Sequence, residues 1–199
     1  MAYQNLGGHE MIINRDKKFM FICVAKTAST SIRRRFEHYQ DPPPEKYHMF
    51  LEDALKLYPY ARDYFKFAFV RNPYDRLYSC YINFKYDGHV WDTHIKKEHS
   101  FRSFIMNLAQ SEYSKYIHLQ PQYKYIKDGN EIGVDFLGRF ENLDKDFAKI
   151  ESILGYPPQA LERIRASSKN REANKYDSEM KEVMQKIYAE DFERFDYEK

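Results

Sequence analysis

An uninterrupted apolar run that leads directly into a lysine-containing loop constrains this 199-residue chain more than any other feature. The run, Phe19 to Val24, is rich in residues that favour β-structure, which is typical of a strand buried on both faces. The loop that follows, Ala25 to Ser31, consists of Lys26 and small residues, most of them with hydroxyl groups that can cap a helix. We therefore predict a strand, a tight loop and a helix that runs through Ile32 to about Tyr39.

A loop of this kind predicts an anion-binding site. Backbone N–H groups converge at the start of a helix, the helix dipole favours negative charge there, and Lys26 adds a full positive charge. The nucleotide-triphosphate P-loop, G-x-x-x-x-G-K-[ST], is matched only at Lys26 and Thr27. We expect the shorter loop to bind one or two tetrahedral groups without a magnesium site, although similar turns in other α/β proteins hold no ligand. The predicted ligand-binding residues are Lys26, Thr27, Ala28, Ser29, Thr30 and Ser31.

Strands and helices are expected to alternate along the rest of the chain. This order predicts an α/β fold, with three α/β/α layers, a central parallel sheet and ligand loops at the carboxyl ends of the strands. We expect one domain over residues 1–199, with residues 1–10 as a loose lead-in. The expected further strands are Met11–Ile13, Tyr64–Val70 and Val134–Phe140; the expected further helices are Leu51–Leu57, one from Pro73 past Phe84, one from Phe101 to Leu108, Leu143–Leu154, and one from Ser178 to about Phe192.

Composition excludes some classes of partner. Thirty-two basic residues against 30 acidic ones give a net charge of +2, which does not indicate nucleic acid as a partner. The basic run Arg33 to Arg35 is expected to be a solvated helix face, with a polyanion site as the alternative. Cys23 and Cys80 lie in apolar surroundings and are expected to be buried, unpaired thiols. The sequence has no 18-residue apolar run and no signal-peptide pattern near its start, so we expect no transmembrane segment and a cytoplasmic location.

A second cationic residue stands in an equivalent position. Arg71 follows the predicted strand that ends at Val70, just as Lys26 follows the first buried strand. Adjacent parallel strands would bring both residues to the same edge of the sheet. Ser79 lies about two turns into the next helix, and an arginine with a serine hydroxyl suits a second phosphate. The structural alternative is an ion pair between Arg71 and Asp75, with Ser79 as a surface hydroxyl.

Three segments, in this order, resemble sulfotransferases, most closely the group with carbohydrate and heparan-type enzymes and their small bacterial relatives. They are Val24 to Ser31, Phe67 to Tyr81 and Gly138 to Leu143. The resemblance implies a fold like that of P-loop NTPases, the donor 3′-phosphoadenosine-5′-phosphosulfate (PAPS) and no metal. The family loop usually reads Pro-Lys-Thr-Gly, whereas Ala25 and Ala28 replace the proline and the glycine here. Alanine can follow the same path if no positive φ is required.

The resemblance also implies roles for individual residues. Lys26 would contact the oxygen that bridges phosphate and sulfate, while the rest of the loop to Ser31 would hold the 5′-phosphosulfate. Arg71 and Ser79 would hold the 3′-phosphate. The implied activity is sulfuryl transfer to a hydroxyl group, and a carbohydrate is the expected acceptor. A small alcohol or phenol as acceptor, a non-catalytic nucleotide-binding relative and a small kinase are the alternatives.

Sulfuryl transfer to a hydroxyl requires a general base, and histidine is the natural candidate near neutral pH. The first choice is His48, because it precedes the helix before the second buried strand and the family often has a histidine there. The second choice is His118, since the family also has a histidine before a segment like Pro121-Gln122, which is expected to shape the acceptor or nucleotide pocket. The oligomeric state is left open by the sequence.

Overall fold

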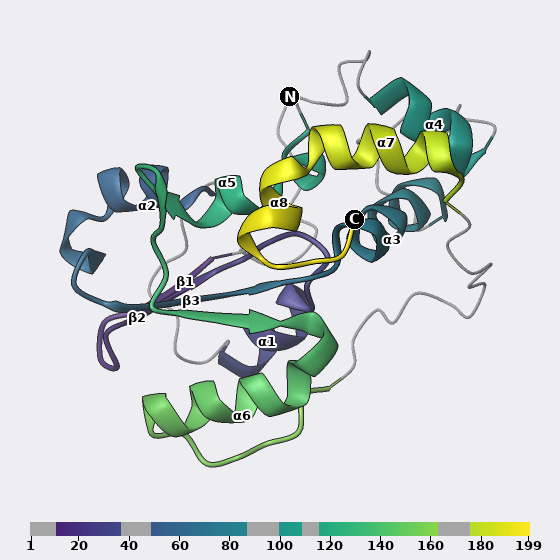
Figure 1. Cartoon of the computed structure of the whole chain (residues 1–199). Coiled ribbons are helices and arrows are strands. Elements are labelled where there is room, and N and C mark those ends of the chain that lie inside the picture. The colour runs from purple at the N-terminus through teal and green to yellow at the C-terminus, as the bar shows by residue number, and fades with distance from the viewer. Residues whose placement is uncertain (1–10, 37–48, 87–99, 109–115, 163–175) are drawn as a thin grey trace, which may run out of the picture.

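A four-stranded sheet in the order β1-β2-β3-β6 lies at the centre of the molecule (Figure 1). The computed structural model describes residues 11–36, 49–86, 100–108, 116–162 and 176–199. The strands are β1 (Ile12–Asn14), β2 (Phe19–Ile22), β3 (Phe65–Val70) and β6 (Phe136–Arg139).

The prediction of a parallel sheet is correct for three strands and wrong for the fourth. β2, β3 and β6 are mutually parallel, but β1 pairs with β2 in the antiparallel sense. Only the turn between Asn14 and Phe19 separates these two strands. A short turn permits an antiparallel hairpin, whereas a parallel connection needs a crossover of a dozen or more residues.

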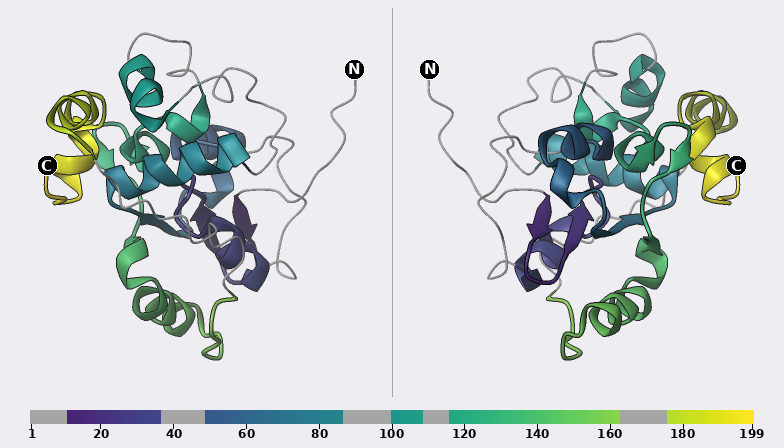
Figure 2. Two further views of the ribbon diagram at one scale, coloured as in Figure 1. Left: turned by 90° about the vertical axis from the view of Figure 1, so that its right-hand side faces the viewer. Right: turned by 90° about the vertical axis from the view of Figure 1, so that its left-hand side faces the viewer.

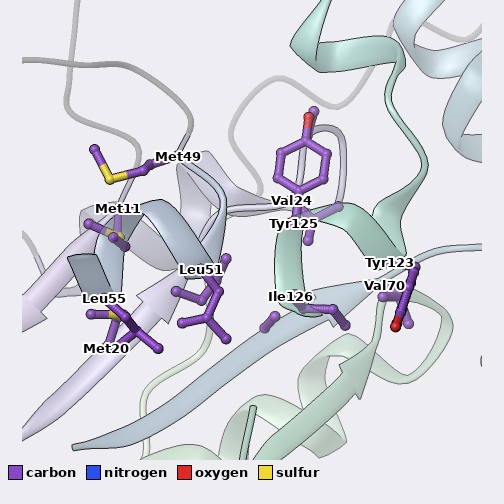
Figure 3. Close-up of a cluster of buried hydrophobic side chains, with 14 of the residues drawn as sticks. Met11, Met20, Val24, Met49, Leu51, Leu55, Val70, Tyr123, Tyr125 and Ile126 are labelled. Carbon is purple, nitrogen blue, oxygen red and sulfur yellow. The ribbon is translucent and has the colours of Figure 1, made fainter. Parts of the chain in front are cut away.

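Side chains of β2 alternate between two buried clusters, as expected of a strand that is covered on both faces. Phe19 and Phe21 pack in one cluster with α1 (Ser29–Phe36) and α6 (Leu143–Leu154). Met20 and Ile22 pack in the other with α2 (Leu51–Leu57) and α5 (Gln122–Ile126), as Figure 3 shows for Met20. The helices of the two clusters lie on opposite sides of the sheet in every view (Figure 2). The described part of the chain therefore has a helical layer on each face of the sheet.

A third apolar cluster lies beyond the carboxyl ends of the parallel strands (Figure 1). It joins α3 (Pro73–Tyr86) and α4 (Phe101–Leu108) to the C-terminal helices α7 (Ser178–Ile187) and α8 (Ala189–Arg194). The single helix that was predicted from Ser178 to Phe192 is divided at Tyr188, whose φ of −109° and ψ of 27° are not helical. The buried Tyr188 hydroxyl donates a hydrogen bond to the Leu119 carbonyl at 2.7 Å.

Short elements complete the described chain. Strands β4 (Lys127–Asp128) and β5 (Glu131–Ile132) form a hairpin around Gly129, which has the positive φ of 64° that such turns favour. The 3₁₀ helices are η2 (Pro59–Ala61), η5 (Ile117–Leu119) and η6 (Phe140–Asn142). The predicted His118–Gln122 segment runs from η5 to the first residue of α5.

The basic run at the end of α1 is tied to α6 and the segment after it. Arg35 Nε lies 2.9 Å from the carboxylate of Glu151, and this carboxylate is 2% exposed. The Arg35 guanidinium also donates to the Pro157 carbonyl at 3.1 Å, while Arg34 lies 3.5 Å from the Glu162 carboxylate. The prediction of a simple solvated face is thus wrong for Arg35, since a nearly buried carboxylate needs a partner of opposite charge.

Candidate functional site

Two cationic residues meet at the carboxyl end of the parallel strands. β2 and β3 pair with Ile22 opposite Ala68, so Lys26 and Arg71 leave the sheet at the same edge. The Arg71 guanidinium donates from Nη1 to the main-chain carbonyl of Lys26 at 3.4 Å. The predicted neighbourhood of Lys26 and Arg71 is therefore present, although they are 45 positions apart in the sequence.

The loop after β2 has an unusual backbone. Lys26 and Ala28 both have positive φ, 66° and 65°. The condition under which alanine was expected to replace the family's glycine without strain is therefore not met, because an L-residue in this region is sterically strained. The hydroxyl of Thr27 donates to the Val24 carbonyl at 2.9 Å, and this buried hydrogen bond links the loop to the end of the strand segment before it.

The hydroxyl residues of the loop differ in their surroundings. Thr27 is fully buried and Ser31 nearly so, whereas Ser29 and Thr30, in the first turn of α1, are half-buried. The first helical hydrogen bond of α1 runs from the Ile32 N–H to the Ala28 carbonyl at 3.1 Å. The N–H groups of Ser29 and Thr30 therefore lie ahead of that bond, at the start of the helix, where anions commonly bind.

Arg71 is fixed on three sides. Its guanidinium carbon lies 4.2 Å from the centre of the Phe140 ring, which follows β6 on the neighbouring strand. Its backbone N–H and carbonyl are both bonded to the side-chain amide of Gln122, at 2.9 and 2.8 Å. A guanidinium that is stacked and anchored in this way is held ready for a charge-assisted, two-pronged contact with an anion.

Ser79 is placed in the second turn of α3 and is half-buried. Its neighbour Cys80 is fully buried and donates from Sγ to the His118 carbonyl at 3.5 Å. Burial raises the pKa of the Cys80 thiol, while the charges of Arg76, Lys26 and Arg71 act against this rise. Cys80 is thus a protonated, buried thiol within the electrostatic reach of both site cations. Cys23 is likewise buried, as predicted.

Of the two candidate general bases, the structure describes only His118. His118 lies in η5, half-buried, with its ring edge-on to that of Phe84 on α3 at a centroid distance of 5.5 Å. Its carbonyl also accepts a hydrogen bond from the buried Arg76 at 3.0 Å. His48 lies outside the described residues. Both histidines therefore remain candidates for the general base.

Several residues that support the site have no clear sequence signal. Gln122 and Asp191 are fully buried polar residues, and Asp191 accepts the N–H groups of Gln122 and Tyr123. Glu141 accepts the N–H of Asn72 at 2.7 Å and joins the end of β3 to that of β6. Only the cap of α3 could have been read from the sequence, because asparagine before proline is a typical helix start and Asn72 Oδ1 accepts the Tyr74 N–H at 3.0 Å.

A model of one protein family, described as "Sulfotransferase family", matches residues 9–198 of this chain. The chain belongs to the sulfotransferase family. A protein of Archaeoglobus fulgidus, whose description reads "Uncharacterized protein", is 30% identical to this sulfotransferase-family chain over 105 residues. Those residues are 53% of this chain and 79% of the archaeal protein. No solved structure matches the chain at a significant level.

The described residues of this sulfotransferase-family chain contain no group of three or more histidine, cysteine, aspartate or glutamate side chains that could hold a metal ion. None of their helices is both long enough and apolar enough to cross a membrane.

The positive φ of Ala28 gives a direct test of the loop geometry. Ala28→Gly should stabilise the protein by up to about 1 kcal/mol. Glycine removes the left-handed strain, although its larger loss of backbone entropy on folding offsets part of this gain. The matched control is Ala25→Gly in the same loop, where φ is not positive and the buried methyl group is lost. Denaturant unfolding measures both variants, and a similar destabilisation by the two glycines would contradict the observed loop.

Proposed function

We propose that this chain transfers a sulfuryl group from PAPS to a hydroxyl group of an acceptor, with a carbohydrate as the favoured acceptor class. The observation that carries the proposal is the contact between the Arg71 guanidinium and the Lys26 loop, in a chain of the sulfotransferase family. Two cationic groups at one sheet edge suit a donor that has phosphate groups at both ends of a nucleoside. Membership of the family supports the donor, while the acceptor class rests on the resemblance to carbohydrate sulfotransferases.

The chemistry of the described residues fits such a donor. The N–H groups at the start of α1 and the hydroxyls of Ser29 and Thr30 would hold the 5′-phosphosulfate, and the stacked Arg71 with Ser79 would hold the 3′-phosphate. Thr27 would contribute only its backbone, because its hydroxyl is bonded to Val24. Ala28 and Ser31 would contribute backbone N–H groups at the helix start in the same way.

Sulfuryl transfer forms a bond between the acceptor oxygen and sulfur and breaks the bond between sulfur and the bridging oxygen. The acceptor proton passes to the general base, and the bridging oxygen leaves with adenosine 3′,5′-bisphosphate. Lys26 would stabilise the charge that builds on this leaving oxygen, by the same electrostatic logic that governs phosphoryl transfer. His48 is the favoured base and His118 the alternative.

Nucleotide binding tests the proposal directly. Adenosine 3′,5′-bisphosphate at 100 times its dissociation constant should stabilise the native protein by about 2.7 kcal/mol, which thermal unfolding detects readily. Transfer of labelled sulfate from PAPS to a panel of sugars, alcohols and phenols then identifies the acceptor. Stabilisation by ATP in place of the bisphosphate would favour a kinase, and bisphosphate binding without transfer to any acceptor would favour a non-catalytic relative.

Removal of the Lys26 charge should mainly affect the chemical step. Lys26→Ala is expected to lower kcat by roughly 10²–10³-fold, the usual cost of losing one group that stabilises transition-state charge. Its melting temperature should change little, because the Lys26 side chain is only half-buried. Lys56→Ala, at a lysine whose side chain is 75% exposed on α2, is the control. Wild-type turnover in Lys26→Ala would contradict the assigned role.

A pH–rate profile distinguishes the two candidate bases. An imidazole must be neutral to accept a proton, so the rate should rise with pH through the pKa of the catalytic histidine. His48→Ala should lose this rise and about 10²–10⁴-fold in rate, whereas His118→Ala should keep the rise. The opposite result would assign the base to His118, and retention of the rise in both variants would contradict a histidine base at either position.

A further inference from the structure

The side chain of Gln122 holds both backbone polar groups of Arg71. Its Oε1 accepts the Arg71 N–H at 2.9 Å, and its Nε2 donates to the Arg71 carbonyl at 2.8 Å. The Gln122 side chain is fully buried, so water cannot replace either bond if it is lost. The amide thus fixes the peptide groups on both sides of the Arg71 Cα, and with them the direction in which the side chain leaves the backbone.

The segment that carries Gln122 is itself held from two sides. The buried carboxylate of Asp191, on α8, accepts the N–H groups of Gln122 at 2.8 Å and Tyr123 at 2.9 Å. These N–H groups are the first two of α5, whose N-cap residue provides no side-chain bond. On the other side, the buried Arg76 of α3 donates to the carbonyls of His118 and Gln120 at 3.0 and 2.7 Å. The segment is therefore anchored to both α3 and α8.

The guanidinium of Arg71 is held less tightly than its backbone. Its contacts include a face-on approach to the Phe140 ring and a long hydrogen bond of 3.4 Å to the Lys26 carbonyl. An aromatic face permits sliding of the guanidinium across the ring, and a long hydrogen bond restrains it weakly. Compared with these two contacts, the two short bonds from Gln122 to the Arg71 backbone restrain the position of Arg71 more firmly.

We propose that Gln122 is a positioning residue that makes the site select a nucleotide with a 3′-phosphate, because it fixes the direction in which the Arg71 side chain leaves the backbone. This inference rests on the proposed function, in which Arg71 binds that phosphate. Gln122 itself does not touch the nucleotide. Its loss should weaken binding of nucleotides that have the 3′-phosphate and leave the binding of nucleotides without it unchanged.

The test compares adenosine 3′,5′-bisphosphate with adenosine 5′-monophosphate by isothermal titration calorimetry. Gln122→Met keeps the length of the side chain but removes both hydrogen bonds. It should weaken bisphosphate binding about tenfold, the equivalent of one to two lost hydrogen bonds, with no change for the monophosphate. Gln120→Met is the matched control, since Gln120 is half-buried and its side chain accepts a solvent-exposed bond from Lys124. It should leave the preference for the bisphosphate as it is in the wild-type protein.

A double variant separates positioning from a general loss of structure. In an Arg71→Ala background, Gln122→Met should not change the ratio of the two affinities, because no guanidinium remains to be aimed. If Gln122→Met does not fold, Gln122→Glu serves instead. It keeps an acceptor for the Arg71 N–H, but when ionised it places a carboxylate oxygen where the amide donated to the Arg71 carbonyl, and the two oxygens repel each other. It should therefore also lower the bisphosphate preference.

Three results would overturn the inference. A bisphosphate preference that survives both Gln122 variants would overturn it and leave the proposed function intact. An equal loss of affinity for both nucleotides would show a purely structural role. A wild-type protein without a preference for the bisphosphate would overturn the proposed function and this inference together.

Discussion

Parallel pairing of β2 with β3 is the constraint on which the site depends. The two strands are neighbours in register, so the chain leaves both at the same edge of the sheet and in the same direction. Lys26 and Arg71 follow these strand ends and come into contact across 45 positions of sequence. β6, the next parallel strand, contributes a third residue to the site. Phe140, directly after β6, provides the ring on which Arg71 stacks. A ligand site at the carboxyl ends of parallel strands is the general rule for sheets of this class.

Much of this arrangement could be predicted from local sequence, for physical reasons. A buried parallel strand needs a mainly apolar run. Such a run marks Phe19–Ile22 without a break, and in Phe65–Val70 only Lys66 interrupts it. Proline at a first helical turn identifies the start of α3 at Pro73. The two cations were found because each follows such a strand. The antiparallel β1 and the break at Tyr188 were not predicted, since pairing and tertiary hydrogen bonds decide them.

The supporting residues could not be predicted in the same way. Gln122 meets Arg71 across 51 positions, and Asp191 meets Gln122 across 69. A glutamine or an aspartate in the sequence is usually exposed, so the burial of these two has no local pattern. Alanine likewise gives no sign that Ala28 has a positive φ. Burial raises the pKa of the Asp191 carboxyl. The charge of Arg76 and the N–H groups of Gln122 and Tyr123, which donate to this carboxylate, act against the rise and favour its ionised form. A buried polar network of this kind favours one arrangement, because its members would lose their bonds in any other.

Residues near the C-terminus thus support a site whose two cationic residues, Lys26 and Arg71, lie in the N-terminal half of the chain. Asp191 holds the segment of Gln122, and the Tyr197 hydroxyl donates to the Glu141 carboxylate at 3.1 Å, which in turn accepts the Asn72 N–H.

The most direct test is a crystal structure with adenosine 3′,5′-bisphosphate. The account predicts the 5′-phosphate on the N–H groups of residues 26–31 and the 3′-phosphate on Arg71 and Ser79. A nucleotide bound elsewhere, or with its 3′-phosphate away from Arg71, would contradict it.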